Sequence, residues 1–149
     1  MEIMAIIPAR GGSKSIPLKN LKLLNGKPLI DYSINSSIKS KFITRTIVSS
    51  DHPKILKRAE KLGAEILKRP KNLATDSSQL EPVMEHCLNH FKLQENYIPD
   101  IIILLQNTSP LRTKNHIDDA LSTFLDSKFD SMMSCYSSHY FLWTLKKNT

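Results

Sequence analysis

Strand-like stretches alternate along this chain with stretches in which apolar residues recur every three or four positions. The strand-like stretches lie at residues 3–7, 46–49, 65–68, 101–105 and 131–135. The intervening stretches predict helices at residues 28–38, 53–62, 80–91 and 117–125. Prolines suit the first turns of the first two helices, and the pair Asn25-Gly26 predicts a turn. The run at 101–105 is apolar on both faces and therefore predicts a central strand.

This alternation predicts an α/β fold with a mostly parallel, Rossmann-like sheet and helices on both faces. A length of 149 residues suits a single domain, residues 1–149. Ligands of such sheets bind outside the carboxyl ends of the strands. Four polar segments follow predicted strands and are therefore expected along one rim: residues 10–20, 50–51, 69 and 106–112.

The net charge of +7 is concentrated in the first half of the chain. Residues 1–72 hold 15 Lys and Arg against 5 Asp and Glu, a net +10, whereas residues 73–149 hold 6 against 9, a net −3. A basic half suits either a nucleic acid or a small polyanion such as a nucleoside triphosphate. Aromatic residues do not interleave with the basic ones, as base stacking requires. We therefore expect no nucleic-acid partner and keep an RNA-binding module only as a lower-ranked alternative.

The loop after the first predicted strand carries the strongest chemical signal. It contains two glycines and the cations Arg10, Lys14 and Lys19. Glycines let backbone N–H groups approach an anion, and fixed cations neutralise the anion's charge. The spacings of the P-loop and of the dinucleotide-binding fingerprint are both absent. The residues alone leave two interpretations open, a phosphate site and a plain basic turn.

Three motifs together resemble the acylneuraminate cytidylyltransferases. They read IIPARGGSK-x-x-P-x-KN with L-x-x-x-x-GKPLI after it, then RP-x-x-LATD, then LLQNTSPLR. The family comprises the CMP-sialic acid synthetases and relatives acting on other nonulosonic acids. The resemblance implies a nucleotide-diphospho-sugar transferase-like fold. It also implies the reaction of CTP with a nonulosonic acid to give the CMP-sugar and pyrophosphate, with Mg²⁺ as cofactor.

The roles of single residues follow from the resemblance, position by position. Arg10 and Lys19 would act in catalysis by stabilising the charge on the phosphates. The nucleotide-binding set would be Arg10, Gly11, Gly12, Ser13, Lys14, Lys19, Asn20, Arg69, Asp76 and Ser77. The sugar-binding set would be Gln106, Thr108, Ser109 and Arg112. Asp76 and Ser77 have an alternative role as caps of the helix that follows them.

Two features depart from the family pattern. Asn107 stands where the family usually carries proline, and the exchange is expected to loosen the turn. Family members are also considerably longer, and the remainder would supply a dimerisation element and the acidic residues that hold Mg²⁺. The metal ligands are therefore left unassigned, and the family's homodimer is not expected from this chain. The alternative function is a catalytically incomplete CTP-binding remnant or subunit.

Other patterns favour ordinary structural roles. The chain has no run long enough to span a membrane and no signal peptide, so we expect a cytoplasmic protein without a membrane partner. Cys87 and Cys135 are interpreted as small buried hydrophobic residues. His86 and His90 are four residues apart, but no third ligand accompanies them, so surface positions are favoured over a metal site. Asp118 is expected to support its helix through the helix dipole.

Overall fold

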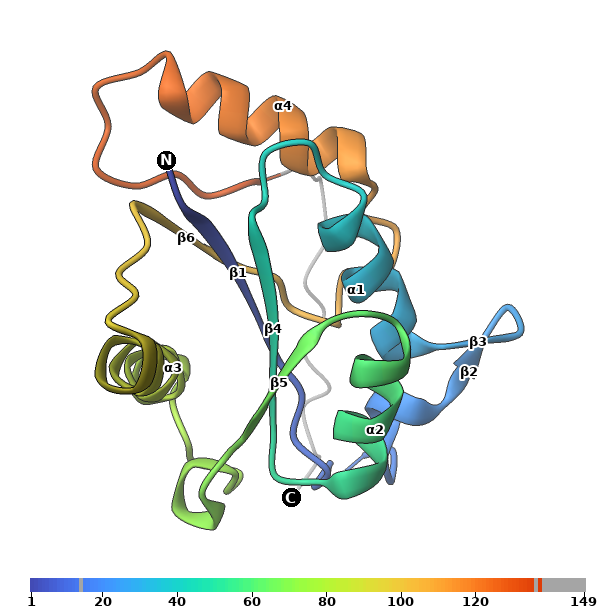
Figure 1. Ribbon diagram of the computed structural model, residues 1–149. Coiled ribbons are helices and arrows are strands. Elements are labelled where there is room, and N and C mark those ends of the chain that lie inside the picture. The colour runs from blue at the N-terminus through green and yellow to red at the C-terminus, as the bar shows by residue number, and fades with distance from the viewer. Residues whose placement is uncertain (14, 136, 138–149) are drawn as a thin grey trace, which may run out of the picture.

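A sheet of four parallel strands forms the centre of the computed structural model, which describes residues 1–13, 15–135 and 137 (Figure 1). The strands are β1 (Ile3–Pro8), β4 (Arg45–Ser50), β5 (Glu65–Lys68) and β6 (Ile101–Leu104), in the order β5-β4-β1-β6. The chain builds the sheet outward from β1 through β4 to β5, and β6 then lies on the other side of β1. The strand order therefore reverses between β1 and β6, where such sheets open a crevice for ligands.

In the described part of the chain, α-helices cover both faces of the sheet (Figure 1). The helices α1 (Leu29–Ile38), α2 (Pro53–Lys61) and α4 (Lys114–Leu125) pack on one face, and α3 (Leu80–Glu95) packs on the other. Ile3, Ala5 and Ile7 of β1 join the first core, while Met4 and Ile6 join the second. Successive side chains of a strand point to opposite faces, so β1 contributes to both cores. The predicted α/β fold is confirmed.

A small hairpin and two short 3₁₀ helices complete the described elements. The hairpin pairs β2 (Leu23–Leu24) with β3 (Lys27–Pro28) in antiparallel fashion. Its two turn residues both have positive φ, 47° at Asn25 and 77° at Gly26, as tight hairpin turns require. The predicted turn is thereby confirmed. The 3₁₀ helices are η1 (Lys19–Leu21) and η2 (Lys71–Leu73).

Two expectations about strands are wrong. Within the described residues, β6 is an edge strand rather than a central one, because it pairs with β1 alone. Ile101 and Ile103 pack into the core on the α1 side, whereas Ile102 is 37% exposed. The core on the α3 side is built from β1, β4 and β5, and it does not extend to Ile102. Residues 131–135 do not form the expected fifth strand, since no described strand pairs with them.

Three side chains behave differently from their sequence patterns. Asp118 is buried and accepts hydrogen bonds from Ser40 Oγ at 2.6 Å and from the Lys41 backbone N–H at 3.1 Å. It therefore ties α4 to the chain just after α1 and does more than interact with its own helix dipole. Cys87 is buried as expected, but Cys135 is exposed. Ile38 ends the apolar stripe of α1 and is 44% exposed, because the helix ends there.

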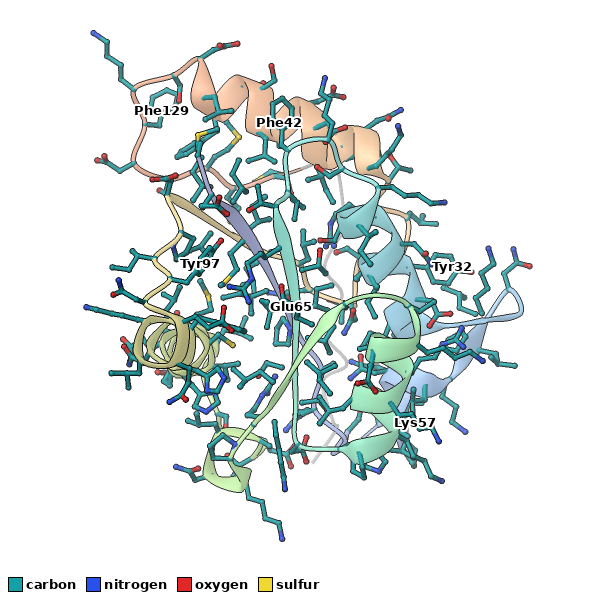
Figure 2. All side chains as sticks on the ribbon, viewed as in Figure 1. Tyr32, Phe42, Lys57, Glu65, Tyr97 and Phe129 are labelled. Atoms are coloured by element: carbon teal, nitrogen blue, oxygen red, sulfur yellow. The ribbon has the colours of Figure 1, made fainter. Side chains whose placement is uncertain are left out.

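Arg45 of β4 fastens the end of α3 to the edge of the sheet. Its guanidinium lies 4.5 Å from the ring centroids of both Phe91 and Tyr97. It donates to Glu65 from Nε at 2.8 Å and to Glu95 from Nη1 at 2.7 Å. Tyr97 and Glu65 are labelled in Figure 2, which draws the described side chains on the ribbon. This cluster lies at the amino ends of the strands and leaves their carboxyl ends open.

Candidate functional site

A cleft of about 270 Å³ lies where the carboxyl ends of the strands were expected to form a rim. Its walls come from the loops that follow β1, β5 and β6 and from the start of α3. The cleft is lined by nine of the predicted site residues, namely Arg10, Gly12, Ser13, Lys19, Asn20, Arg69, Asp76, Gln106 and Thr108. Segments up to about a hundred residues apart in sequence therefore meet at one place, as the rule for parallel sheets predicts.

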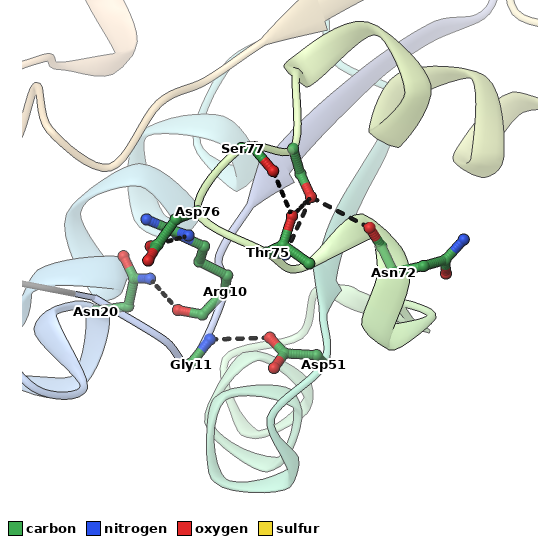
Figure 3. A network of polar contacts seen from close by, with 9 residues as sticks. Arg10, Gly11, Asn20, Asp51, Asn72, Thr75, Asp76 and Ser77 are labelled. Carbon is green, nitrogen blue, oxygen red and sulfur yellow. Dashed lines mark hydrogen bonds and ion pairs between the residues drawn. The ribbon is translucent and has the colours of Figure 1, made fainter.

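The loop after β1 is held by hydrogen bonds to its backbone. The Ala9 N–H donates to the Ser49 carbonyl at 2.9 Å, and the Gly11 N–H donates to Asp51 Oδ1 at 2.9 Å. Asn20 Nδ2 donates to the Arg10 carbonyl at 3.0 Å. The last two contacts are drawn in Figure 3. Gly11 is buried and does not line the cleft, so the structure gives it a role in packing the loop.

An ion pair joins this loop to the segment before α3. Arg10 Nη1 lies 2.7 Å from Asp76 Oδ1, and the two side chains are 33% and 43% exposed (Figure 3). The alternative role of Asp76 and Ser77 as helix caps is wrong, because the residue at the N-cap of α3 is Gln79. Ser77 is not among the residues that line the cleft, and its hydroxyl oxygen lies 3.2 Å from the Thr75 hydroxyl oxygen.

Arg69 brings a buried positive charge to the wall of the cleft. It is 5% exposed and donates from Nε to Ser49 Oγ at 3.1 Å and from Nη2 to the Ser49 carbonyl at 2.7 Å. Burial lowers the pKa of Arg69, although a guanidinium stays charged in proteins. Two of its five N–H donors are oriented by Ser49, so the guanidinium plane is fixed. Such a group can recognise a carbonyl or an anion with a defined geometry.

The segment after β6 contributes two predicted residues to the cleft and leaves two outside it. Gln106 and Thr108 line the cleft, whereas Ser109 and Arg112 do not. Arg112 Nη2 donates to the Gln106 carbonyl at 3.0 Å, and burial lowers the pKa of Arg112. Lys14, which was also predicted to bind the nucleotide, lies outside the described residues.

Asn107 belongs to the site, although the sequence did not assign it a ligand-binding role. It lines the cleft, is 5% exposed and donates from Nδ2 to Asn20 Oδ1 at 3.1 Å. The same nitrogen lies 3.4 Å from the Pro8 carbonyl oxygen. The side chain of Asn107 thus ties the end of β6 to the loop after β1, and the expected loosening of the turn relative to proline stays a prediction. The available signal was an amide in place of proline just after a predicted strand.

The electrostatics of the cleft suit an anionic ligand. Arg10, Lys19 and Arg69 bring three positive charges to its lining, and Asp76 is the one carboxylate among the described lining residues. The described residues contain no group of three or more His, Cys, Asp or Glu side chains that could hold a metal ion. Within the same part of the chain, no helix is both long and apolar enough to cross a membrane.

Comparisons with known proteins agree with this geometry. A family model described as cytidylyltransferase matches residues 4–140. The chain is 37% identical over 142 residues to N-acylneuraminate cytidylyltransferase A of Danio rerio, an alignment that covers 95% of this chain and 32% of that protein. It is 35% identical over 141 residues to pseudaminic acid cytidylyltransferase of Campylobacter jejuni, covering 94% of this chain and 60% of that protein.

Solved structures share the fold. The structure of CMP:2-keto-3-deoxy-manno-octonic acid synthetase complexed with CTP aligns with a TM-score of 0.67 and 21% sequence identity. The alignment covers 85% of this chain and 48% of that one. The chain thus spans between about a third and three fifths of the length of the curated relatives named above.

Proposed function

Because the chain belongs to the cytidylyltransferase family, we propose that its cleft binds CTP and activates a nonulosonic acid as the CMP-sugar. The observation that carries this proposal is the convergence of Arg10, Lys19 and Arg69 on one cleft at the reversal of strand order. Three positive charges against one paired carboxylate suit the four negative charges of a nucleoside triphosphate. The relatives named above are cytidylyltransferases of N-acylneuraminate and of pseudaminic acid.

The proposed placement of the ligand follows the walls of the cleft. The triphosphate lies along the loop from Arg10 to Asn20, with Gly12 and Ser13 in its lining and with Gly11 and Lys14 in the same loop. The cytidine lies toward Arg69 and the segment with Asp76 and Ser77. The sugar acid lies toward Gln106 and Thr108, which line the cleft beside the loop. Ser109 and Arg112 follow in the same segment and stay predictions as sugar contacts.

The proposed reaction is a displacement at the α-phosphate of CTP. The anomeric hydroxyl oxygen of the sugar acid forms a bond to the α-phosphorus, and the bond to the oxygen that bridges toward the β-phosphate breaks. Pyrophosphate leaves with that oxygen, and the hydroxyl proton passes to solvent. Negative charge builds on the phosphate oxygens during this step, so catalysis consists mainly of positioning and of charge stabilisation by Arg10 and Lys19.

A metal ion belongs to this proposal, although the described residues do not by themselves form a site for it. Cytidylyltransferases of this family are generally metal-dependent. We propose Mg²⁺, which proteins commonly bind through one or two carboxylates together with substrate phosphates. The carboxylate that lines the cleft, Asp76, is paired with Arg10, and no cluster of ligating side chains accompanies it among the described residues.

A second candidate function is a CTP-binding chain that does not complete the reaction. It is favoured by the alignment lengths, since the chain covers 32% of the zebrafish relative. One experiment separates the two functions. The 149-residue chain is supplied with CTP, Mg²⁺ and either N-acetylneuraminic or pseudaminic acid, and CTP binding and pyrophosphate release are both measured. Release establishes the transferase, whereas binding without release supports the second function.

The charged loop is tested by comparing Lys19→Ala with Lys22→Ala. Lys19 lines the cleft, and Lys22 lies just beyond η1, exposed and outside the lining. A charged hydrogen bond contributes about 1.5–3 kcal/mol, so Lys19→Ala should weaken CTP binding about tenfold or more in calorimetry. Lys22→Ala should bind as the wild type does. Equal affinities of all three proteins would contradict the placement of the triphosphate.

A further inference from the structure

The backbone connection between β1 and β6 stops short of the cleft. Its last hydrogen bond runs from the Leu105 N–H to the Ile6 carbonyl at 3.0 Å. Beyond that hydrogen bond the segments that follow β1 and β6 separate, since the strand order of the sheet reverses here. The side chain of Asn107 spans the gap, from the end of β6 to Asn20 and toward Pro8.

The contacts of Asn107 form a relay with a fixed direction. The Arg10 carbonyl can only accept, so the side-chain atom of Asn20 that meets it must be the Nδ2 donor. Asn20 then presents Oδ1 to Asn107, and the Asn107 atom that meets it must also be a donor. The Pro8 carbonyl oxygen lies 3.4 Å from the same atom and requires a donor as well. The orientations of both amides therefore follow from backbone carbonyls.

This direction leaves the other end of the Asn107 amide without a partner. Its Oδ1 is buried and accepts no hydrogen bond in the part of the chain that the structure describes. A buried acceptor without a donor costs free energy, which offsets what the Nδ2 hydrogen bonds contribute to stability. Stability of the fold is thus a weak reason for an amide at this position. The relay ends on the Arg10 carbonyl, which precedes the N–H groups of Gly11 and Gly12.

We propose that Asn107 is a positioning residue for the nucleotide: through Asn20 it fixes the peptide after Arg10 and so the loop that receives the triphosphate. The inference rests on the proposed function, because it concerns how the same cleft holds CTP. Asn107 acts by donating a hydrogen bond to Asn20 Oδ1, which orients Asn20 to donate to the Arg10 carbonyl in the loop. Asn107 thus acts through the side chain of Asn20 and contacts neither the phosphates nor the reacting atoms.

The first test separates affinity from stability. Asn107→Ala should weaken CTP binding about two- to tenfold, the equivalent of one neutral hydrogen bond, while the unfolding midpoint in urea stays close to that of the wild type. Asn72→Ala is the matched control, since Asn72 lies in η2 outside the cleft lining and is labelled in Figure 3. Unchanged affinity in Asn107→Ala overturns the proposal. Affinity loss that merely accompanies a large loss of stability also overturns it.

The second test asks whether the effect passes through Asn20. Asn107→Ala introduced into Asn20→Ala should cause no further loss of CTP affinity, because both residues belong to one relay. Losses that multiply would show independent actions and overturn the proposal. If the wild-type chain does not bind CTP at all, the proposed function itself fails, and this result is obtained before any variant is made.

The third test asks whether the donor is what matters. Asn107→Asp has the same shape, and its carboxyl donates to Asn20 Oδ1 only when it is protonated. Burial beside acceptors raises the pKa of such a carboxyl. The CTP affinity of Asn107→Asp relative to the wild type at the same pH should therefore recover as the pH falls from 8 to 5. A ratio that stays constant with pH would overturn the relay, and the wild-type reference removes the titration of CTP itself.

Discussion

Gly11 and Gly12 are adjacent, and the structure predicts that a methyl group added to Gly11 affects stability whereas one added to Gly12 affects ligand binding. A Cβ on Gly11 would lie 2.8 Å from His52 Cβ and 2.9 Å and 3.0 Å from His52 Cδ2 and Cγ. These distances are too short for carbon atoms, and His52 Cβ moves only with the backbone that leads into α2. A Cβ on Gly12 would meet no atom within 4 Å, and Gly12 lines the cleft.

The magnitudes follow from these contacts. Overpacking of this kind costs about 1–3 kcal/mol, so Gly11→Ala should lower the free energy of unfolding by that amount. For a chain of this length each kcal/mol lowers Tm by about 2–4 °C. Gly12→Ala should change stability by less than about 0.5 kcal/mol. Because its methyl group lies in the space proposed for the triphosphate, it should instead weaken CTP binding.

The assay is urea unfolding combined with CTP calorimetry on both variants. A second substitution tests the cause, since His52→Gly removes all three atoms that the new methyl group would meet. The double variant Gly11→Ala/His52→Gly should be more stable than the sum of the two single effects predicts. Additive effects, or a Gly11→Ala variant that unfolds at the wild-type urea concentration, would refute the packing argument.

Two further predictions concern charged groups in the fold. Asp31 of α1 is 2% exposed and accepts a hydrogen bond from Arg58 Nε at 2.9 Å. Arg58→Ala leaves this buried carboxylate without its partner and should lower the free energy of unfolding by about 3 kcal/mol in urea. Adding Asp31→Asn to that variant should recover part of the loss. Burial, His90 and Arg69 hold the pKa of His86 below its ordinary value. As the pH falls, His86 is therefore protonated in the unfolded chain before it is protonated in the folded chain, and the free energy of unfolding should fall below about pH 6.5. Urea unfolding at pH 7, 6 and 5 should show a smaller fall in His86→Gln than in the wild type.

The sequence predicted the elements well because local spacing determines them. The continuous apolar run along β1, from Ile3 to Ile7, indicated a buried strand, and both cores use it. Strand order and coverage depend instead on contacts between distant segments. The run at 101–105 has the composition of a central strand, yet among the described strands it pairs with β1 alone. Composition carries no information about which strands pair.

The same distinction applies to the candidate site. The rule that ligands bind at the carboxyl ends of parallel strands placed Arg10, Arg69 and Gln106 in one cleft from their order alone. The pairing of Arg10 with Asp76 and the contact of Asn107 with Asn20 were not predicted. Both join segments that meet only in the folded chain, and both use side chains whose types suit several other roles.

The cleft separates the groups that hold the loop from the groups that carry its charge. The loop is held by the Ser49 carbonyl, by Asp51 and by Asn20, each of which bonds to its backbone. None of these contacts involves a cationic side chain. Among the described residues none forms an ion pair with Lys19, so its ammonium group remains available to a ligand. Arg10 differs, because its pair with Asp76 must be exchanged or shared when an anion binds. An ion pair this exposed contributes at most about 1 kcal/mol to stability. A triphosphate can therefore displace Asp76 from Arg10 at little cost in affinity. The ion pair thus holds Arg10 in the lining of the cleft, where it stays available to an anion.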